Sequence, residues 1–492
     1  MNNYGYKIAA QKAKQKEQRK LEKVQKELKY PKKKKKKPEP ALDLYPSINN
    51  KKFRDIDWDN NEMVNCSNNL LKRYEKNNHK LQIINLDTGF GKTALAIHYA
   101  AQHLNKYPKA TIIIVAPRAV KDGLGWHETL YSYNKTHKTK IQPYMIETPD
   151  RFASILDNPK TFKKVIKELD PNSLIILDEI HNYKTPTSKR SKKLQKLPHI
   201  RKLGLTATAI SNNMVLDGCS YLIMDGKYRN KTDFFSKSDL TNRIGFWGEL
   251  LIYDENGELN SALWPYAEQF KKELAQILFK PNINPDNFIM PQVNTKIIEL
   301  ESNNQLISDL QSLKRAYLDR AFDSAGDFTN AVVYRINSDK DRLDKLLKIV
   351  KKKNIFQPLI FYHNTAVMEK ICEIFDDNNI DYQVVSGDNP ISSIDKSLSN
   401  PILIQYQAGA EGIEFAESNT TIFYQNQYSF IKLKQAKGRN VRRGKDHKVT
   451  HYYIKALNTP DEEIFNKVDG LFELNSNFVN ELIQNYQYTK EK

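Results

Sequence analysis

A short run of glycines, a lysine and a threonine has the residue types needed to hold phosphate groups. It follows the apolar segment Leu81–Leu86 directly and consists of Asp87, Thr88, Gly89, Phe90, Gly91, Lys92 and Thr93. Glycines let the backbone curl until its N–H groups point at phosphate oxygens, and the N-terminus of the helix predicted to follow adds partial positive charge. Lys92 is then expected to reach the β- and γ-phosphates of a nucleotide, and the Thr93 hydroxyl to bind Mg²⁺. Leu86 stands where the general phosphate-loop pattern has its first glycine, so this position does not match the pattern.

Two adjacent carboxylates follow a second apolar segment. Leu174–Leu177 is followed by Asp178 and Glu179, and side chains that leave the carboxyl ends of parallel strands meet at one edge of the sheet, where the phosphate loop also lies. Asp178 is expected to hold Mg²⁺ through water, and Glu179 to orient or deprotonate the attacking water. Alone the pair is weak evidence, because acidic residues after a strand often only cap a helix. Together with the phosphate loop it predicts phosphoryl transfer to water.

An arginine pair far along the chain can complete such a site. Arg439 and Arg442 are three residues apart, so they lie on one face if the segment is helical. An arginine that reaches the transferred phosphate can accelerate hydrolysis about a thousandfold or more. The alternative is a basic helix face turned to solvent, and this segment alone does not decide between the two.

Two series of short apolar runs supply the strands that would position these side chains. Most runs are rich in Ile, Leu or Val and are separated by longer mixed segments, which is the rhythm of strands alternating with helices around a parallel sheet. The sequence therefore predicts an α/β protein with two tandem parallel-sheet domains. The first series comprises Leu81–Leu86, Thr111–Ala116, Tyr144–Ile146, Leu174–Leu177 and Leu203–Leu205, and the second comprises Leu359–Tyr362, Tyr382–Val385, Ile402–Tyr406, Thr421–Tyr424 and Thr450–Ile454.

Changes in composition divide the 492 residues into four predicted segments. Of the net charge of +19, +11 lies in residues 1–40, which hold 15 Lys and Arg against 4 Asp and Glu, so the remainder is only mildly basic. That balance suits a protein that binds phosphates in a cleft. The lysine run 32–37 has three open interpretations, namely a nucleic-acid anchor, a nuclear import signal or a solvated linker. We expect a basic tail, disordered or helical, at 1–45, a first domain at 46–290 with a helical insertion at about 211–290, a second domain at 295–470, and a C-terminal helix or tail at 471–492.

Several classes of protein do not fit this composition. Hydrophobic residues make up 39% and charged residues 27%, which favours folded domains over wholesale disorder. The longest apolar stretches are too short to span a membrane, and the first thirty residues contain no apolar segment of the kind that directs secretion. Cys66, Cys219 and Cys372 are far apart, with no spacing typical of zinc or disulfides. We therefore expect a cytoplasmic protein, with the nucleus left open by the lysine run, and no membrane partner.

The motifs resemble those of the superfamily 2 helicases, and their surroundings resemble the Snf2-like branch. The segment 178–184 with Ser188 resembles helicase motif II in its DEAH-box form, and 205–213 resembles motif III with the asparagine-rich sequel of the Snf2 branch. Further resemblances are Ala116–Arg118 and Trp126–Glu128 to motif Ia, Thr148–Arg151 to motif Ib, Leu359–Tyr362 to motif IV, Gln407–Ile413 to motif V and Gln435–Gly444 to motif VI.

This resemblance, which spans about residues 50–470, implies two RecA-like domains that bind ATP and Mg²⁺ between them. It implies nucleotide contacts by Gln435 as well as by the phosphate loop, and it implies that motifs III and V couple the ATP state to the grip on nucleic acid. The residues carried over for this coupling are Thr206, Ala207, Thr208, Gly409 and Gly412. Members of the family often carry an adenine-reading glutamine before the phosphate loop. Residues 54–80 contain no glutamine, so the base preference is open.

The expected function is that of an ATP-dependent helicase or double-strand translocase. DNA is the expected partner, with RNA open, and binding should be sensitive to salt and largely independent of sequence. The lysine-, asparagine- and tyrosine-rich chain also resembles the helicase-like ATPases of cytoplasmic replicons, those of the poxvirus nucleoside triphosphatase I and linear-plasmid helicase types. That likeness implies replication or transcription machinery of a virus or plasmid. The alternative is an ATPase subunit of a restriction, repair or transcript-release complex without strand-separating activity.

Overall fold

The computed structural model of the chain describes most residues between Ile56 and Val468. The predicted tails, 1–45 and 471–492, lie outside the described residues. The described residues are 56, 58, 61–77, 79–87, 89–122, 125–197, 199–210, 214–245, 250–254, 258–281, 291–387, 389, 394–395, 397–409, 415, 417–427, 429–441 and 448–468.

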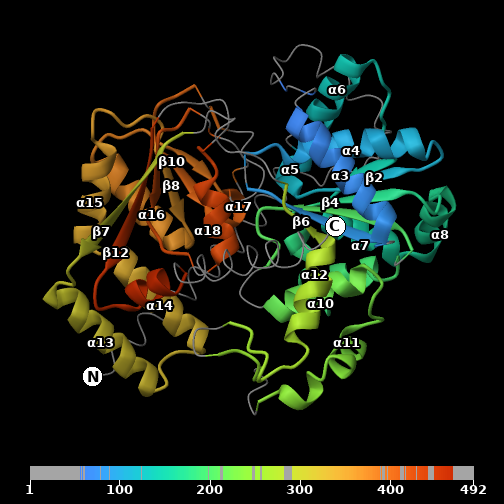
Figure 1. Ribbon diagram of the computed structural model, residues 1–492. Coiled ribbons are helices and arrows are strands. Elements are labelled where there is room, and N and C mark those ends of the chain that lie inside the picture. Colours follow the sequence, from blue (N-terminus) through green and yellow to red (C-terminus); the bar gives the residue numbers. More distant parts are fainter. Residues whose placement is uncertain are drawn as a thin grey trace. The chain divides into compact units, whose positions relative to one another are not determined.

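In the described residues the first sheet has six strands, and every neighbouring pair is parallel. Figure 1 labels β2, β4 and β6 of this sheet. The strand order is β3-β2-β4-β5-β1-β6. Five of these strands coincide with predicted ones to within two residues at each end, and the sixth, β6, lies in the segment predicted to be a helical insertion. The strands are β1 (Leu81–Asn85), β2 (Ile112–Val115), β3 (Met145–Glu147), β4 (Leu174–Asp178), β5 (Arg201–Thr206) and β6 (Leu278–Phe279).

Alternate residues of the central strands are buried on opposite faces of this sheet, as the two-residue period of a strand requires. Ile84, Ile114 and Ile176 pack with residues of α3, α4 and α6, whereas Ile83 and Ile175 pack with residues of α7, α10 and α12. The helices are α3 (Asn61–Asn77), α4 (Lys92–Lys106), α5 (Arg118–Asp122), α6 (Gly125–His137), α7 (Pro149–Asp157), α8 (Pro159–Glu168), η2 (Ile180–Tyr183), α9 (Lys189–Leu194), α10 (Met214–Met224), α11 (Lys231–Lys237), η3 (Thr241–Arg243) and α12 (Ala267–Ile277).

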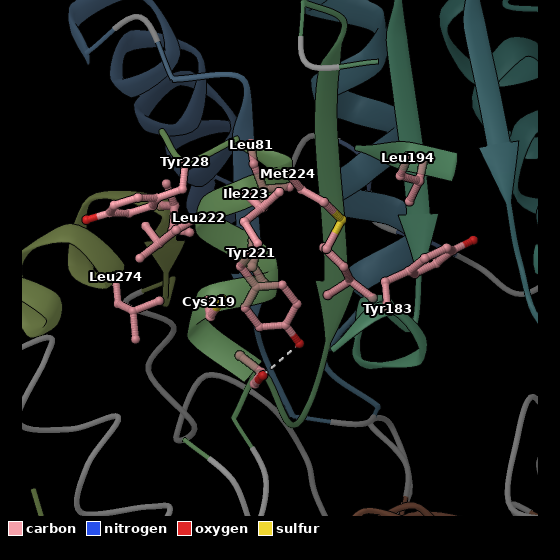
Figure 2. Packing of buried hydrophobic residues seen from close by; sticks show 14 of the residues in the cluster. Leu81, Tyr183, Leu194, Cys219, Tyr221, Leu222, Ile223, Met224, Tyr228 and Leu274 are labelled. Carbon is pink, nitrogen blue, oxygen red and sulfur yellow. Dashed lines mark hydrogen bonds between the residues drawn. The ribbon is translucent and has the colours of Figure 1, made fainter. Parts of the chain in front are cut away.

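The segment after β5 supplies part of this core. Figure 2 shows the side chains of α10 packed among buried residues, including Tyr183 from η2 and Leu274 from α12. The hydroxyl of Tyr221 donates a hydrogen bond to the carbonyl of Ala209 at 2.8 Å, so the chain that leaves β5 is fixed to α10. The described part of residues 211–290 contains the helices α10, α11, η3 and α12 together with the short strand β6, and it contributes buried residues to the core of the first sheet.

The second sheet also has six strands, all in parallel pairs, in the order β7-β12-β11-β8-β10-β9. Five strands match the predicted series, and the edge strand β7 was not predicted. The strands are β7 (Val293–Leu300), β8 (Leu359–Tyr362), β9 (Gln383–Val385), β10 (Ile402–Gln405), β11 (Thr420–Phe423) and β12 (Val449–Ala456), and the helices are α13 (Asn304–Leu318), α14 (Ala325–Asn337), α15 (Lys340–Val350), α16 (Thr365–Asp377), α17 (Tyr406–Gly409) and α18 (Phe430–Lys437).

The predicted fold class, two parallel-sheet α/β domains in tandem, is confirmed by these two sheets. Among the described residues, the structure contains no helix whose length and apolar character would let it cross a membrane.

Candidate nucleotide-binding site

The phosphate loop joins β1 to α4, and its two glycines have a left-handed backbone conformation. Gly89 and Gly91 have φ of 90° and 86°, a left-handed region that side chains disfavour. A Cβ atom at Gly91 would meet nothing within 4 Å, so conformation rather than crowding requires glycine here. Gly91 is the N-cap of α4 and contributes no side-chain hydrogen bond. The first N–H groups of α4 therefore have no N-cap side chain to satisfy them, which suits an anion-binding helix end.

The lysine and the threonine of the loop begin α4. Lys92 Nζ donates hydrogen bonds to the carbonyl oxygens of Leu86 at 2.9 Å and Asp87 at 3.3 Å. The ammonium group therefore lies at the carboxyl end of β1, beside the loop that it is predicted to serve. Thr93 is half-buried in the same helical turn, and Thr88 lies outside the described residues.

Asp178 is the last residue of β4, and its carboxylate is deeply buried. Trp126 Nε1, from α6, donates a hydrogen bond to Asp178 Oδ2 at 3.0 Å. Burial raises the pKa of Asp178 above its usual range, and the charge of Glu179 adds to this, whereas Trp126 and Lys92 act in the opposite direction. Trp126 thus positions a predicted Mg²⁺-holding carboxylate. The sequence pointed to Trp126 only through the resemblance to motif Ia and gave no sign of this contact.

Glu179 follows with a left-handed backbone, φ 53° and ψ 59°, which costs a residue other than glycine about 1 kcal/mol or more. Its Oε2 lies 3.2 Å from His181 Nδ1. Burial raises the pKa of Glu179, but the hydrogen bond and charge of His181, together with the charges of Lys92 and Arg439, outweigh it and hold the pKa below its usual range. Glu179 is therefore held as a carboxylate that can accept a hydrogen bond from water.

His181 also connects the carboxylates to the end of β5. Its Nδ1 lies 3.1 Å from Thr206 Oγ1, and the same hydroxyl accepts a hydrogen bond from the backbone N–H of Thr208 at 3.0 Å. The carbonyl of Thr206 accepts a hydrogen bond from the N–H of Leu86 at 3.0 Å. The predicted coupling segment, Thr206 to Thr208, therefore contacts both the carboxylate segment and the start of the phosphate loop.

A lysine that the sequence did not single out reaches this site from α18. Lys434 Nζ donates a hydrogen bond to the carbonyl of Ala207 at 2.9 Å and forms an ion pair with Asp87 Oδ1 at 2.9 Å. Lys434 directly precedes Gln435, which is buried in the same helix. The only signal for Lys434 in the sequence was its position beside the segment that resembles motif VI.

Of the two predicted arginines, the structure describes Arg439. Helix α18 ends at Lys437 with Gly438 as its C-cap, so Arg439 lies just beyond the end of the helix. Whether the two arginines share one face stays a prediction. Arg439 is buried, and its charge acts on Glu179, so it lies on the side of the carboxylates. Arg442 and Gly412 lie outside the described residues, and Gly409 is the last residue of α17.

The groups present fit a nucleoside triphosphate with a divalent cation. Two left-handed glycines precede a helix N-terminus without a side-chain cap, and an ammonium, a hydroxyl and two carboxylates lie at the ends of β1 and β4. Helix N-termini and lysine bind phosphate oxygens, and hydroxyl and carboxylate oxygens are ligands for Mg²⁺. The role of each residue stays a prediction.

Comparisons with known proteins agree with this arrangement. Residues 60–211, which include β1 to β5, match the family described as the res subunit of type III restriction enzymes, and residues 341–444 match the helicase conserved C-terminal domain. The chromatin-remodeling ATPase INO80 of Eremothecium gossypii is 22% identical over 416 residues, which are 77% of this chain and 28% of that protein. The chain thus matches less than a third of the length of this much larger relative.

Proposed function

Because this chain is a superfamily 2 helicase of the Snf2-like type, we propose that it hydrolyses ATP to move along double-stranded DNA. Its two domains are those of an ATP-dependent nucleic-acid motor. The proposal adds the track, which is duplex DNA, and the mode, which is translocation with or without strand separation. Phosphate and sugar contacts carry no base information, so we expect movement that is largely independent of sequence.

The observation that carries the proposal is the contact of His181 with both Glu179 and Thr206. His181 Nδ1 lies 3.2 Å from the carboxylate and 3.1 Å from the hydroxyl. A motor must link the state of its hydrolytic group to its grip on the track, and here the two predicted segments share one side chain. Because one ring nitrogen makes both contacts, a movement of His181 toward Glu179 would weaken its hydrogen bond with Thr206.

We assign each group a role in hydrolysis. Lys92 holds the β- and γ-phosphates at the end of β1, with Gln435 contacting the nucleotide. Glu179 orients or deprotonates the attacking water, and Arg439 and Arg442 compensate charge on the transferred phosphate. Thr93, and Asp178 through water, would hold Mg²⁺, which would supply compensation for the negative charge that develops on the phosphate oxygens.

Lys434 adds a contact that can change during the cycle. It binds the carbonyl of Ala207 and the carboxylate of Asp87, so it joins the second domain to both the coupling segment and the phosphate loop. We infer that phosphates in the loop compete with Asp87 for this ammonium, since each phosphate group offers the lysine a stronger negative charge. Nucleotide binding would then release or redirect a link between the domains.

The test is ATP hydrolysis measured without nucleic acid and with duplex DNA, single-stranded DNA or RNA. Stimulation by duplex DNA supports the proposal, and stimulation by RNA alone contradicts the choice of track. Glu179→Gln and Lys92→Ala should abolish turnover, whereas the matched controls at exposed positions, Glu301→Gln and Lys109→Ala, should hydrolyse ATP normally. Normal turnover in Glu179→Gln would show that the water-orienting role is wrong.

Displacement assays then identify the mode of movement. Release of a third strand from a triplex with no separation of the duplex indicates translocation, and release of one duplex strand indicates a helicase. We also propose that the motor serves the replication or transcription of a small viral or plasmid replicon. Support for this comes from the composition of the chain, and a test is whether the motor co-purifies with the polymerase of its replicon.

A second candidate function follows from the match of residues 60–211 to the res subunit of type III restriction enzymes. Under this alternative the chain is the ATPase subunit of a restriction, repair or transcript-release complex and does not separate strands. It predicts weak hydrolysis by the isolated chain and strong stimulation by a partner subunit. Full stimulation by DNA alone would exclude that alternative.

A further inference from the structure

A hollow lined by lysines lies on the second sheet, between β7, β12 and α15. Its volume is about 440 Å³. Lys296 comes from β7, Tyr452 from β12, Lys345 and Lys348 from α15, and Lys352 from the turn after α15, with isoleucines of β7 and α15 completing the lining. Among the described residues that line this hollow, none is acidic. A concave surface with one sign of charge concentrates ions of the other sign.

Contacts with Tyr452 hold two of these ammonium groups in place. Lys352 Nζ lies 5.0 Å and Lys296 Nζ 5.8 Å from the centre of the Tyr452 ring, and Lys352 Nζ also donates a hydrogen bond to Tyr452 Oη at 3.3 Å. Lys296 and Tyr452 are register partners in neighbouring parallel strands. Because cations already approach this ring, it is not a platform for a stacked base, and the hollow is suited to recognise charge.

The dipole of α15 does not explain why all four lysines lie around this hollow. Lys348 lies in the last turn of α15, where a helix favours positive charge. Lys296 belongs to an edge strand and Lys345 to an earlier turn, so neither benefits from that effect. Within the part of the chain that the structure describes, no ion pair joins any of the four lysines to an acidic group. Their mutual repulsion is relieved when an anion binds.

This hollow is separate from the predicted nucleotide site. Lys352 precedes the amino end of β8, which begins at Leu359, whereas the segments that resemble motifs V and VI follow the carboxyl ends of β10 and β11. Ligands of parallel sheets bind at the carboxyl ends of the strands. The lysines therefore have no part in the hydrolytic chemistry assigned above.

We propose that this hollow binds the phosphate backbone of nucleic acid as a second contact, apart from the path served by the helicase motifs. The inference rests on the proposed function, since it assigns an additional site to the same track. From Lys345 to Lys352 the lysines extend over about 10 Å at the rise of a helix. One strand of DNA presents about three phosphates over that length. An acidic protein segment is the rival ligand that the experiment must exclude.

The experiment compares the full chain with a triple variant, Lys296→Gln, Lys345→Gln and Lys348→Gln, in binding a labelled 40-base-pair duplex over a range of salt concentrations. Removing one phosphate-binding cation lowers the slope of log affinity against log salt by about 0.9, so we expect the slope to fall by roughly 2 to 3. Affinity at low salt should fall about tenfold or more. The matched control is Lys160→Gln, Lys163→Gln and Lys164→Gln, which removes three exposed lysines from the first domain and should leave the slope unchanged.

ATP hydrolysis by the same proteins separates failure of this inference from failure of the proposed function. If the triple variant and the wild type share one salt slope while duplex DNA stimulates both, the second contact does not exist and the motor stands. If duplex DNA stimulates neither protein, the proposed track is wrong. Binding of a labelled polyglutamate peptide tests the rival ligand. If the triple variant no longer binds this peptide but binds the duplex as the wild type does, the inference is overturned in favour of an acidic protein ligand. Circular dichroism of both triple variants establishes that they are folded.

Discussion

The indole of Trp126 donates a hydrogen bond to the carboxylate of Asp178 at 3.0 Å, and both side chains are buried. Trp126→Phe keeps most of the packing and removes the donor, which leaves a buried carboxylate with one fewer partner. We expect the free energy of unfolding to fall by about 1 to 3 kcal/mol. Because Trp126 lowers the pKa of Asp178, the variant should also need a higher pH for half-maximal ATP hydrolysis.

The matched control for this change is Trp264→Phe. Trp264 is also fully buried, and its Nε1 donates a hydrogen bond to the carbonyl of Ser238 at 2.7 Å. This control variant should be destabilised by a similar amount in urea denaturation and keep the pH profile of the wild type. If both variants shift the profile alike, the hydrogen bond to Asp178 has no special part in hydrolysis.

Gly91→Ala separates backbone conformation from crowding in the phosphate loop. The position has φ 86° but has room for a methyl group, so the substitution costs about 1 to 2 kcal/mol through the left-handed conformation alone. We expect weaker nucleotide binding, measured by calorimetry with a non-hydrolysable ATP analogue. Gly125→Ala is the control, because a Cβ atom there meets only ordinary contacts at 3.8 Å. Equal binding by both variants would mean that the loop does not hold the nucleotide through this turn.

Lys434→Gln should uncouple hydrolysis from nucleic acid. The change removes the ion pair with Asp87 and weakens the contact with the carbonyl of Ala207. We expect the ratio of DNA-stimulated to basal hydrolysis to fall about tenfold, a change of roughly 1.4 kcal/mol in the barrier. Steady-state rates with and without DNA provide the measurement. Lys432→Gln, two residues earlier in α18, is the control, and an identical decrease in that variant would mean that charge on α18 matters without the specific contact.

The buried side chain of Lys202 should make the free energy of unfolding depend on pH. Its burial lowers the pKa to about 7, although its Nζ lies within hydrogen-bond distance of the carbonyls of Leu197, Ile200 and Met224. In the unfolded chain a lysine titrates near pH 10.4, so between about pH 7 and 10 the unfolded state binds a proton that the folded state lacks. The contribution of Lys202 therefore makes the protein more stable as pH rises through this range. Below about pH 7 both states are protonated, and this dependence ends.

Urea denaturation of the wild type and Lys202→Met at several pH values checks this prediction. The free-energy difference between the two proteins should move in favour of the wild type from about pH 7 to about pH 9.5, because methionine does not titrate. A difference that stays constant over this range would mean that Lys202 keeps its proton, stabilised by the three carbonyls.

Much of the fold was predictable because buried parallel strands have a strong local signal. The runs at Leu174–Leu177 and Ile402–Tyr406 are continuous apolar segments between polar ones, as strands covered on both faces must be. Strand β6 has only two residues, too few for any periodicity. Strand β7 is an edge strand whose residues are mostly exposed, so it has no continuous buried apolar run, and its pairing with β12 depends on residues about 150 positions away.

In the candidate site, too, the features that depend on neighbouring residues in the sequence were predictable, and those that depend on distant residues were not. The segment from Asp87 to Thr93 and the pair Asp178 and Glu179 were identifiable, because backbone shape and charge at one sheet edge are determined by contiguous residues. The contacts made by Trp126 and Lys434 join residues 52 and 227 positions apart, and no local pattern records which buried polar groups will meet. The end of α18 at Lys437 depends on Gly438, and the spacing of the two arginines alone carries no information about where that helix stops.

The left-handed backbone of Glu179 has a consequence for laboratory evolution. A library at this position, screened only for resistance to heat, should be enriched in glycine and asparagine, because both adopt this conformation at lower cost. Screened for turnover, the same library should return glutamate. Selection for stability and selection for turnover thus favour different residues at this position. Comparing the free energies of unfolding of the variants from the two screens would give the stability that is lost by keeping a carboxylate at the end of β4.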